Sequence, residues 1–117
     1  MTSLLIVDDE LSIAHAAAEL LRFAGYEVAT EPNGHVALAS MRRRRPDLLL
    51  LDYMMPVLDG LQTLAAMRGD TALAAIPVIL MSAAPERAIP RGERWLRFLS
   101  KPFREATLLT AVASALA

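Results

Sequence analysis

Three short runs of consecutive apolar residues constrain the fold of this chain most strongly. They are Leu4–Val7 and the runs within Asp47–Leu51 and Pro77–Met81. None of them alternates apolar with polar residues, so each is predicted to be a strand buried on both faces. Strands covered on both faces are typical of parallel sheets. Two further strands are predicted at Tyr26–Thr30 and Trp95–Leu99.

Segments with helical periodicity separate most of these strands. Apolar residues recur three or four positions apart, as one face of a helix requires, in four groups: Ile13, Ala17, Leu20, Leu21 and Ala24; Ala37, Leu38 and Met41; Leu61, Leu64 and Ala65; and Leu108, Leu109, Val112 and Leu116. Gly25 is interpreted as the end of the first helix and Asp59 as the N-cap of the third. The alternation predicts an α/β fold with right-handed crossovers, formed by one domain over residues 1–117.

Charge and composition exclude several classes of function. The 12 basic and 13 acidic residues give a net charge of -1, which does not favour nucleic acid or an anionic membrane as a partner. The run Arg42–Arg45 is interpreted as the solvated end of a helix. The absence of cysteine excludes disulfides and thiol chemistry. No signal peptide is evident and no apolar run approaches the ~20 residues that span a bilayer, so a cytoplasmic protein is expected.

Polar residues follow four of the predicted strands. Asp8 and Asp9 come after the first strand, Asp52 after the third, Ser82 after the fourth and Lys101 after the fifth. Ligands of open parallel sheets bind at the edge where the strands end, so we expect these side chains to meet there. Lys101 is the only lysine, which favours a site that needs a compact point charge.

Three carboxylates in one place favour a divalent cation. Asp8, Asp9 and Asp52 would otherwise repel one another and raise one another's pKa values. Ligands that are all oxygen, without Cys or His, suit a hard ion such as Mg²⁺. Ser82 and Lys101 beside such an ion could hold the oxygens of a phosphoryl group. The sequence therefore predicts a magnesium site that handles phosphoryl groups.

Four motifs in this order resemble the receiver (REC) domain of two-component response regulators. They are LLIVDDE at 4–10, LLLLDYMMPVLDG at 48–60, VILMSA at 78–83 and FLSKPF at 98–103. Each motif is modest alone, whereas the four together are highly specific, and the resemblance covers essentially the whole chain. It implies a doubly wound five-stranded parallel sheet in the flavodoxin-like order 2-1-3-4-5.

The resemblance also implies roles for the acidic residues. Asp52 is expected to be the phosphoacceptor. Asp9 and Asp52 are expected to bind Mg²⁺ directly, and the backbone carbonyl of Met54 to supply another ligand. Asp8 is expected to act largely through water.

Further roles implied by the resemblance concern the phosphoryl oxygens and the switch. Ser82 and Lys101 are expected to bind the phosphoryl oxygens, and Ser82 and Phe98 to move when the protein is phosphorylated. Ala83 is the small residue that leaves room for the donor. The peptide bond between Lys101 and Pro102 is expected to be cis, as X-Pro bonds allow.

The function implied is that of a phosphorylation-dependent signalling switch in a two-component system or phosphorelay. A phosphohistidine would donate its phosphoryl group to Asp52 with Mg²⁺ present, so the protein would catalyse only its own phosphorylation and dephosphorylation. The expected partners are a sensor histidine kinase or a histidine phosphotransfer protein, and an unknown downstream protein. Neither nucleic acid nor a membrane is expected as a partner.

Two other classes of function remain as alternatives. One is a receiver-like protein-interaction module that acts independently of phosphorylation, although such a module has no need for the complete set of acids, hydroxyl and lysine. The other is a Mg²⁺-dependent phosphatase of the haloacid dehalogenase type. That enzyme would need a second acid two positions after its nucleophile, and Met54 occupies that position.

The segment between the fourth and fifth strands departs from the family's pattern. It is shorter than usual by about one helical turn. Pro85 can begin a helix, whereas Pro90 and Gly92 oppose its continuation. Residues 85–94 are therefore expected to form an atypical, shortened fourth helix of at most one turn, mobile without phosphate.

Overall fold

A five-stranded parallel sheet in the order β2-β1-β3-β4-β5 runs through the protein. The computed structural model describes residues 1–117. Its strands are β1 (Ser3–Val7), β2 (Glu27–Glu31), β3 (Leu48–Asp52), β4 (Val78–Ser82) and β5 (Arg97–Ser100). The fold class and strand order expected from the sequence are confirmed, while the strand bounds differ by one or two residues.

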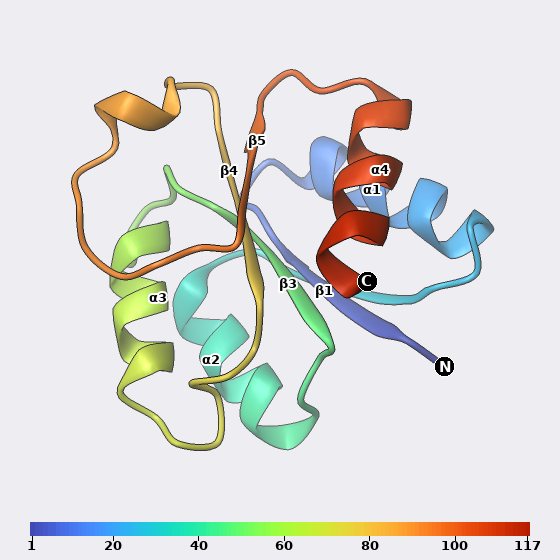
Figure 1. The fold of residues 1–117 in the computed structure, drawn as a ribbon. Helices are drawn as coiled ribbons and strands as arrows, with labels where there is room; N and C mark the ends of the chain where they lie inside the picture. The colour runs from blue at the N-terminus through green and yellow to red at the C-terminus, as the bar shows by residue number, and fades with distance from the viewer.

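Four α-helices cover the two faces of the sheet. They are α1 (Leu11–Phe23), α2 (Gly34–Arg43), α3 (Gly60–Arg68) and α4 (Glu105–Leu116). Helices α1 and α4 pack on one face, and α2 and α3 pack on the other (Figure 1). The direction of winding therefore reverses at β1 and β3, which lie side by side at the centre of the sheet.

The two hydrophobic layers explain why the strands lack an alternating pattern. Successive residues of a strand point to opposite faces. Leu49 and Leu51 of β3 accordingly pack with α2 and α3, whereas Leu48 and Leu50 pack with α1 and α4. All four side chains are fully buried, and burial of each contributes about 1.5–3 kcal/mol.

Two helix ends agree with the sequence-based interpretation. Gly25 follows the end of α1 with φ of 103°, a left-handed conformation that glycine adopts without a Cβ clash. Asp59 caps α3, because its carboxylate accepts from the Gln62 amide at 2.8 Å and the Gln62 side chain accepts from the Asp59 amide at 2.9 Å. Such a reciprocal pair satisfies two amides that the helix leaves free.

The connection between β4 and β5 contains no α-helix. It forms one 3₁₀ turn, η1 (Glu86–Ala88), followed by irregular chain. The expected shortened element is confirmed, whereas its mobility stays a prediction. Ile89 fixes the segment to the core, where it is 5% exposed. Nearer to β5, the Arg68 side chain on α3 fixes the same segment by donating a hydrogen bond to the Arg94 carbonyl at 3.1 Å.

The prediction that Trp95 belongs to the fifth strand is wrong. Strand β5 begins at Arg97, and the Leu96 amide makes the first bond to β4 by donating to the Val78 carbonyl at 2.8 Å. The Trp95 indole N–H donates to Glu86 Oε2 at 2.7 Å. The indole therefore ties the end of the irregular segment back to η1.

The arginine run at the end of α2 is solvent-exposed, as interpreted, but two of its members are paired. Arg42 Nε lies 2.9 Å from Asp70 Oδ2, and Arg44 forms an ion pair with Glu27. The Arg42 hydrogen bond also holds the pKa of Asp70 below its usual value. Among the helices, none is long and apolar enough to cross a bilayer.

Candidate functional site

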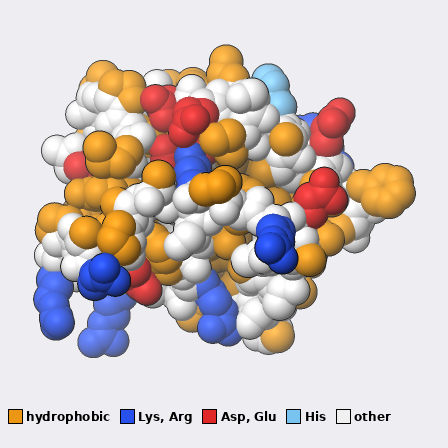
Figure 2. Space-filling model, turned by 90° about the horizontal axis from the view of Figure 1, so that it is seen from above, with side chains coloured by type: hydrophobic (Ala, Val, Ile, Leu, Met, Phe, Trp, Pro, Cys, Tyr) orange, Lys and Arg blue, Asp and Glu red, His pale blue; other side chains and the backbone are white.

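The predicted site residues lie at the edge where the strands end. Asp8 directly follows β1, Asp52 and Ser82 are the last residues of β3 and β4, and Lys101 directly follows β5. Figure 2 views the molecule from this side and shows acidic side chains gathered against a basic one, with hydrophobic side chains around them. Strands β1 and β3 flank the point where strand order reverses, which is where open sheets bind ligands.

Lys101 joins three acids at the centre of the site. Its Nζ lies 2.7 Å from Asp8 Oδ2, 3.2 Å from Asp52 Oδ1 and 3.3 Å from Glu10 Oε1. Its side chain is only 8% exposed. An ammonium group has one proton for each of these acceptors. The peptide bond from Lys101 to Pro102 is cis, which confirms the expectation.

The acids keep Lys101 in its charged form. Burial alone would lower the pKa of Lys101. The hydrogen bond to Asp8 and the negative charges of Asp52 and Asp8 outweigh this effect, and the pKa lies above its ordinary value. Lys101 is therefore a permanent positive charge at this edge of the sheet.

Asp52 has an unusual affinity for protons. Burial is the main cause and the charge of Asp8 the second, and together they raise the pKa of Asp52 to about 7 despite the opposing effect of Lys101. The side chain sits at the end of a fully apolar strand, so water solvates its charge poorly. Asp52 therefore titrates near neutral pH when no cation is bound.

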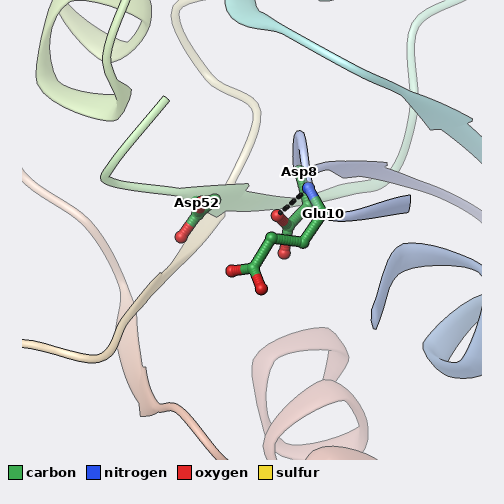
Figure 3. A group of neighbouring side chains, drawn as sticks. All are labelled: Asp8, Glu10 and Asp52. Atoms are coloured by element: carbon green, nitrogen blue, oxygen red, sulfur yellow. Dashed lines mark hydrogen bonds between the residues drawn. The ribbon is translucent and has the colours of Figure 1, made fainter. Parts of the chain in front are cut away.

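Asp8, Glu10 and Asp52 form a compact group of carboxylates. One oxygen from each lies within 4.8 Å of the others. Figure 3 shows the Glu10 side chain extending into the same space as the two aspartates. Asp8 is fully buried, and its Oδ1 accepts a hydrogen bond from the Glu10 amide at 3.0 Å. These carboxylate oxygens are ligands of the kind that a hard divalent ion prefers.

The acids that lie together in the structure are not the same set that the sequence predicted. Asp9 is exposed and is not part of the compact group, although its charge contributes to the raised pKa of Asp52. That Asp9 binds the ion directly stays a prediction. Glu10 lies in the group but was not among the predicted site residues. The available signal was its place as the third acid of LLIVDDE.

The loop from β3 to α3 turns sharply next to Asp52. Gly60 makes this possible, because a Cβ there would lie 2.6 Å from the Asp52 carbonyl oxygen. The Gly60 amide donates to the Tyr53 carbonyl at 2.8 Å and closes the loop. Met54 directs its side chain outward with 66% exposed, so a role for its backbone carbonyl stays a prediction. Val57 adopts φ of 69°, a conformation that disfavours β-branched residues.

The predicted switch residues lie on neighbouring strands. Ser82 is 1% exposed, and its Oγ accepts from the Ala84 amide at 3.0 Å. Phe98 is partly buried and packs against the core layer on the α2 and α3 face. Ala83 is exposed beside the site. These positions suit the predicted roles, which stay predictions.

A surface groove of about 510 Å³ adjoins the site between α1 and α4. Glu10, Ala83 and Lys101 line it together with Glu105 at the start of α4. Its remaining walls are mostly apolar and come from α1, from α4 and from Pro102 and Phe103 before α4. The groove therefore opens next to the Lys101 ammonium.

Several known proteins are similar to this chain. The protein PilG of Pseudomonas aeruginosa is 34% identical over 111 residues, covering 92% of this chain and 82% of PilG. The chemotaxis response regulator CheY4 of Vibrio cholerae is 30% identical, with a TM-score of 0.89 and 99% of each chain covered. The chain also matches longer DNA-binding response regulators, of which it spans 50% of the length.

One similar structure contains a metal ion. It is the receiver domain of the sensor histidine kinase PA1611 from Pseudomonas aeruginosa, described with a magnesium ion coordinated in the active-site cleft. It is 26% identical, has a TM-score of 0.90, and the match covers 98% of this chain and 97% of that one. The family model of the response regulator receiver domain matches residues 4–113. With the fold, the strand order and this match in agreement, the chain belongs to the response regulator receiver domain family.

Proposed function

We propose that the protein is a phosphorylation-dependent switch of a two-component system or phosphorelay, with Asp52 as its phosphoacceptor. One observation carries this proposal. Asp52 is a buried carboxylate, 3% exposed, whose Oδ1 lies 3.2 Å from the only lysine of the chain. A buried nucleophile with a permanent positive charge beside it is suited to accept an anionic group.

The reaction begins with deprotonated Asp52. A carboxylate oxygen attacks the phosphorus of a phosphohistidine, or of a small donor such as acetyl phosphate, in line with the leaving group. With phosphohistidine, the new P–O bond forms as the P–N bond breaks, and the imidazole nitrogen keeps the electron pair and takes up a proton. Later, water attacks the phosphorus, the bond to Asp52 breaks, and inorganic phosphate leaves. The protein thus catalyses only its own phosphorylation and dephosphorylation.

Asp8, Glu10 and Asp52 fit Mg²⁺ by their chemistry and spacing, and the exposed Asp9 lies between the first two in sequence. We assign Asp9, Asp52 and the backbone carbonyl of Met54 as its protein ligands, with Asp8 acting largely through water. When bound, Mg²⁺ neutralises charge on the phosphoryl oxygens. The magnesium ion described for the Pseudomonas aeruginosa receiver supports this assignment.

Lys101 and Ser82 hold the phosphoryl oxygens. The Lys101 ammonium forms an ion pair with Asp52, its Nζ 3.2 Å from Oδ1, so it can donate a hydrogen bond to a phosphoryl oxygen attached there. Ser82 ends the neighbouring strand and turns its hydroxyl toward the phosphoryl group. Its movement leaves space that Phe98 can occupy, which shifts the protein between two arrangements.

The partners follow from this chemistry. A sensor histidine kinase or a histidine phosphotransfer protein supplies the phosphoryl group. A downstream protein recognises the arrangement that phosphorylated Asp52 favours. Residues 1–117 form one receiver domain in this proposal.

Phosphorylation with a small donor tests the proposal. Incubation with acetyl phosphate and Mg²⁺ should increase the intact mass by one phosphoryl group, and chelation of Mg²⁺ should prevent it. Asp52→Asn should abolish the increase, whereas Asp70→Asn, which changes an aspartate paired with Arg42 outside the site, should leave it unchanged. Partner binding that is the same with and without phosphorylation would instead favour an interaction module.

A further inference from the structure

Glu10 stands at a helix end but does not cap the helix. It is the N-cap residue of α1, where short polar side chains such as that of Asp usually accept a hydrogen bond from an amide of the first turn. The Glu10 side chain makes no such bond. Its Oε1 lies 3.3 Å from Lys101 Nζ instead. The carboxylate therefore serves Lys101 rather than the helix.

Glu10 and Asp8 form one unit around the ammonium group. Asp8 binds Lys101 through Oδ2 at 2.7 Å and the Glu10 amide through Oδ1 at 3.0 Å. The Glu10 side chain then returns to the same ammonium group, and Figure 3 shows it reaching past Asp8. Two hydrogen bonds of the ammonium group thus go to residues that follow β1, and its nitrogen lies 3.2 Å from Asp52 Oδ1 as an ion pair.

The two acids restrain Lys101 from different sides. Asp8 is fully buried and holds the ammonium from within the protein. The Glu10 side chain is 58% exposed and reaches Lys101 from the solvent side, where both residues line the groove beside α1. Without Glu10, a flexible lysine could turn outward to water, because one of its protons would lack an acceptor in the protein.

We propose that Glu10 is a positioning residue for Lys101, holding its ammonium beside Asp52 Oδ1, where a phosphoryl oxygen arrives. This inference rests on the proposed function of Asp52. Glu10 itself touches neither the donor nor the reacting atoms. Its effect is on the rate of phosphoryl transfer, through the orientation of a group that holds the phosphoryl oxygen.

The competing role for Glu10 is to attract the cation by its charge. A residue that acts through charge changes the Mg²⁺ concentration needed for half-maximal rate, and excess Mg²⁺ restores the rate. A positioning residue lowers the rate even at saturating Mg²⁺ and donor. Glu10→Gln also distinguishes the two roles. It removes the negative charge that would attract the cation but keeps an oxygen that can accept a hydrogen bond from Lys101.

The experiment compares Glu10→Ala, Glu10→Gln and the control Glu105→Ala. Glu105 is exposed and lines the same groove, but it forms no ion pair with Lys101. Its replacement by alanine changes the net charge as much as Glu10→Ala does. Initial rates of phosphorylation by acetyl phosphate are measured by intact mass over a range of Mg²⁺ and donor concentrations. Thermal unfolding of each variant checks that it is folded.

We expect Glu10→Ala to lower the maximal rate about tenfold, comparable to the smaller losses that follow removal of a residue that orients a metal ligand. Glu10→Gln should keep most of the rate, and Glu105→Ala all of it. A Glu10→Ala rate equal to that of Glu105→Ala, or one restored by excess Mg²⁺, overturns the inference while leaving the proposed function intact. A wild-type protein that is not phosphorylated overturns the proposed function itself.

Discussion

Lys101 Nζ lies 2.7 Å from Asp8 Oδ2, and this pair connects the ends of β5 and β1 across two intervening strands. The Lys101 side chain is 8% exposed and that of Asp8 is fully buried. Because the pair crosses above β3 and β4, it places a positive charge directly over the end of β3, where Asp52 lies. The geometry of the site therefore depends on residues far apart in sequence.

Removal of Lys101 should destabilise the metal-free protein. Lys101→Ala leaves Asp8 and Asp52 buried without their cation, and breaking such a buried pair costs about 3 kcal/mol or more. Lys101→Arg should restore little of this, because a planar guanidinium does not fit a site shaped for a point charge. Urea unfolding without Mg²⁺ measures the loss. The exposed Arg87→Ala is the control, and equal stability of the two variants would contradict the structural role of Lys101.

The stability of the metal-free protein should fall as pH rises toward neutrality. The pKa of Asp52 is about 7 in the folded protein and 3.8 when unperturbed. Between these values the folded protein binds a proton that the unfolded chain has lost, so the free energy of unfolding decreases with rising pH. Each pH unit between the two pKa values lowers the free energy of unfolding by up to about 1.4 kcal/mol.

The same reasoning predicts how a variant and a metal change this profile. Asp52→Asn carries no charge, so its free energy of unfolding should exceed that of the wild type at pH 8, and its dependence on pH in this range should be weaker. Mg²⁺ should stabilise the wild type most above pH 7, where Asp52 is ionised. Urea unfolding with and without Mg²⁺ gives both profiles. Identical profiles for wild type and Asp52→Asn would show that Asp52 titrates normally.

Val57 should be a position where substitution stabilises the protein. Its φ of 69° is unfavourable for a β-branched residue, and its side chain is 93% exposed, so the protein loses almost no packing when it is removed. Left-handed geometry costs a residue with a Cβ roughly 1–2 kcal/mol, and glycine avoids this cost. Glycine also loses more conformational entropy on folding, which offsets part of the gain. Val57→Gly should therefore raise the free energy of unfolding by about 1 kcal/mol. Phe23→Gly, which is equally exposed but lies in α1, should destabilise. A loss of stability in Val57→Gly would contradict the prediction.

The segment between β4 and β5 should exchange its amide hydrogens quickly before phosphorylation. The amides of residues 91–95 donate no hydrogen bond within the protein. The anchors at Ile89, Arg94 and Trp95 hold the segment in place without protecting these amides. Hydrogen exchange measured by NMR should show rapid exchange at 91–95 and slow exchange in α3. Equal protection of the two would mean that a regular helix forms there in solution.

The strands and their shared edge could be predicted from the sequence because each depends on local pattern. Runs such as Leu48–Leu51 are short and do not alternate, so they favour a strand covered on both faces, and the residue after such a run is then expected at the carboxyl edge. This rule places Asp8, Asp52, Ser82 and Lys101 correctly without any knowledge of their contacts. The Asp59 cap was equally predictable, because it needs only the neighbouring residues of its own helix.

The contacts that sequence reasoning missed involve irregular chain. Glu10 is the N-cap residue of α1, but its side chain contacts Lys101, a residue that follows β5 and is distant in sequence. Trp95 lies in an apolar context that resembles a strand, yet its indole binds Glu86 in η1. Neither segment has a repeating pattern that would fix the direction of a side chain.

Chemical mapping of the phosphorylated residue tests the central claim most directly. After reaction with acetyl phosphate and Mg²⁺, borohydride reduces an aspartyl phosphate to homoserine, and peptide mass spectrometry then locates the changed residue. The account predicts one homoserine, at position 52, and none in a sample treated without the donor. Homoserine at Asp8 or Asp9, or a phosphoryl group that survives in Asp52→Asn, would contradict it.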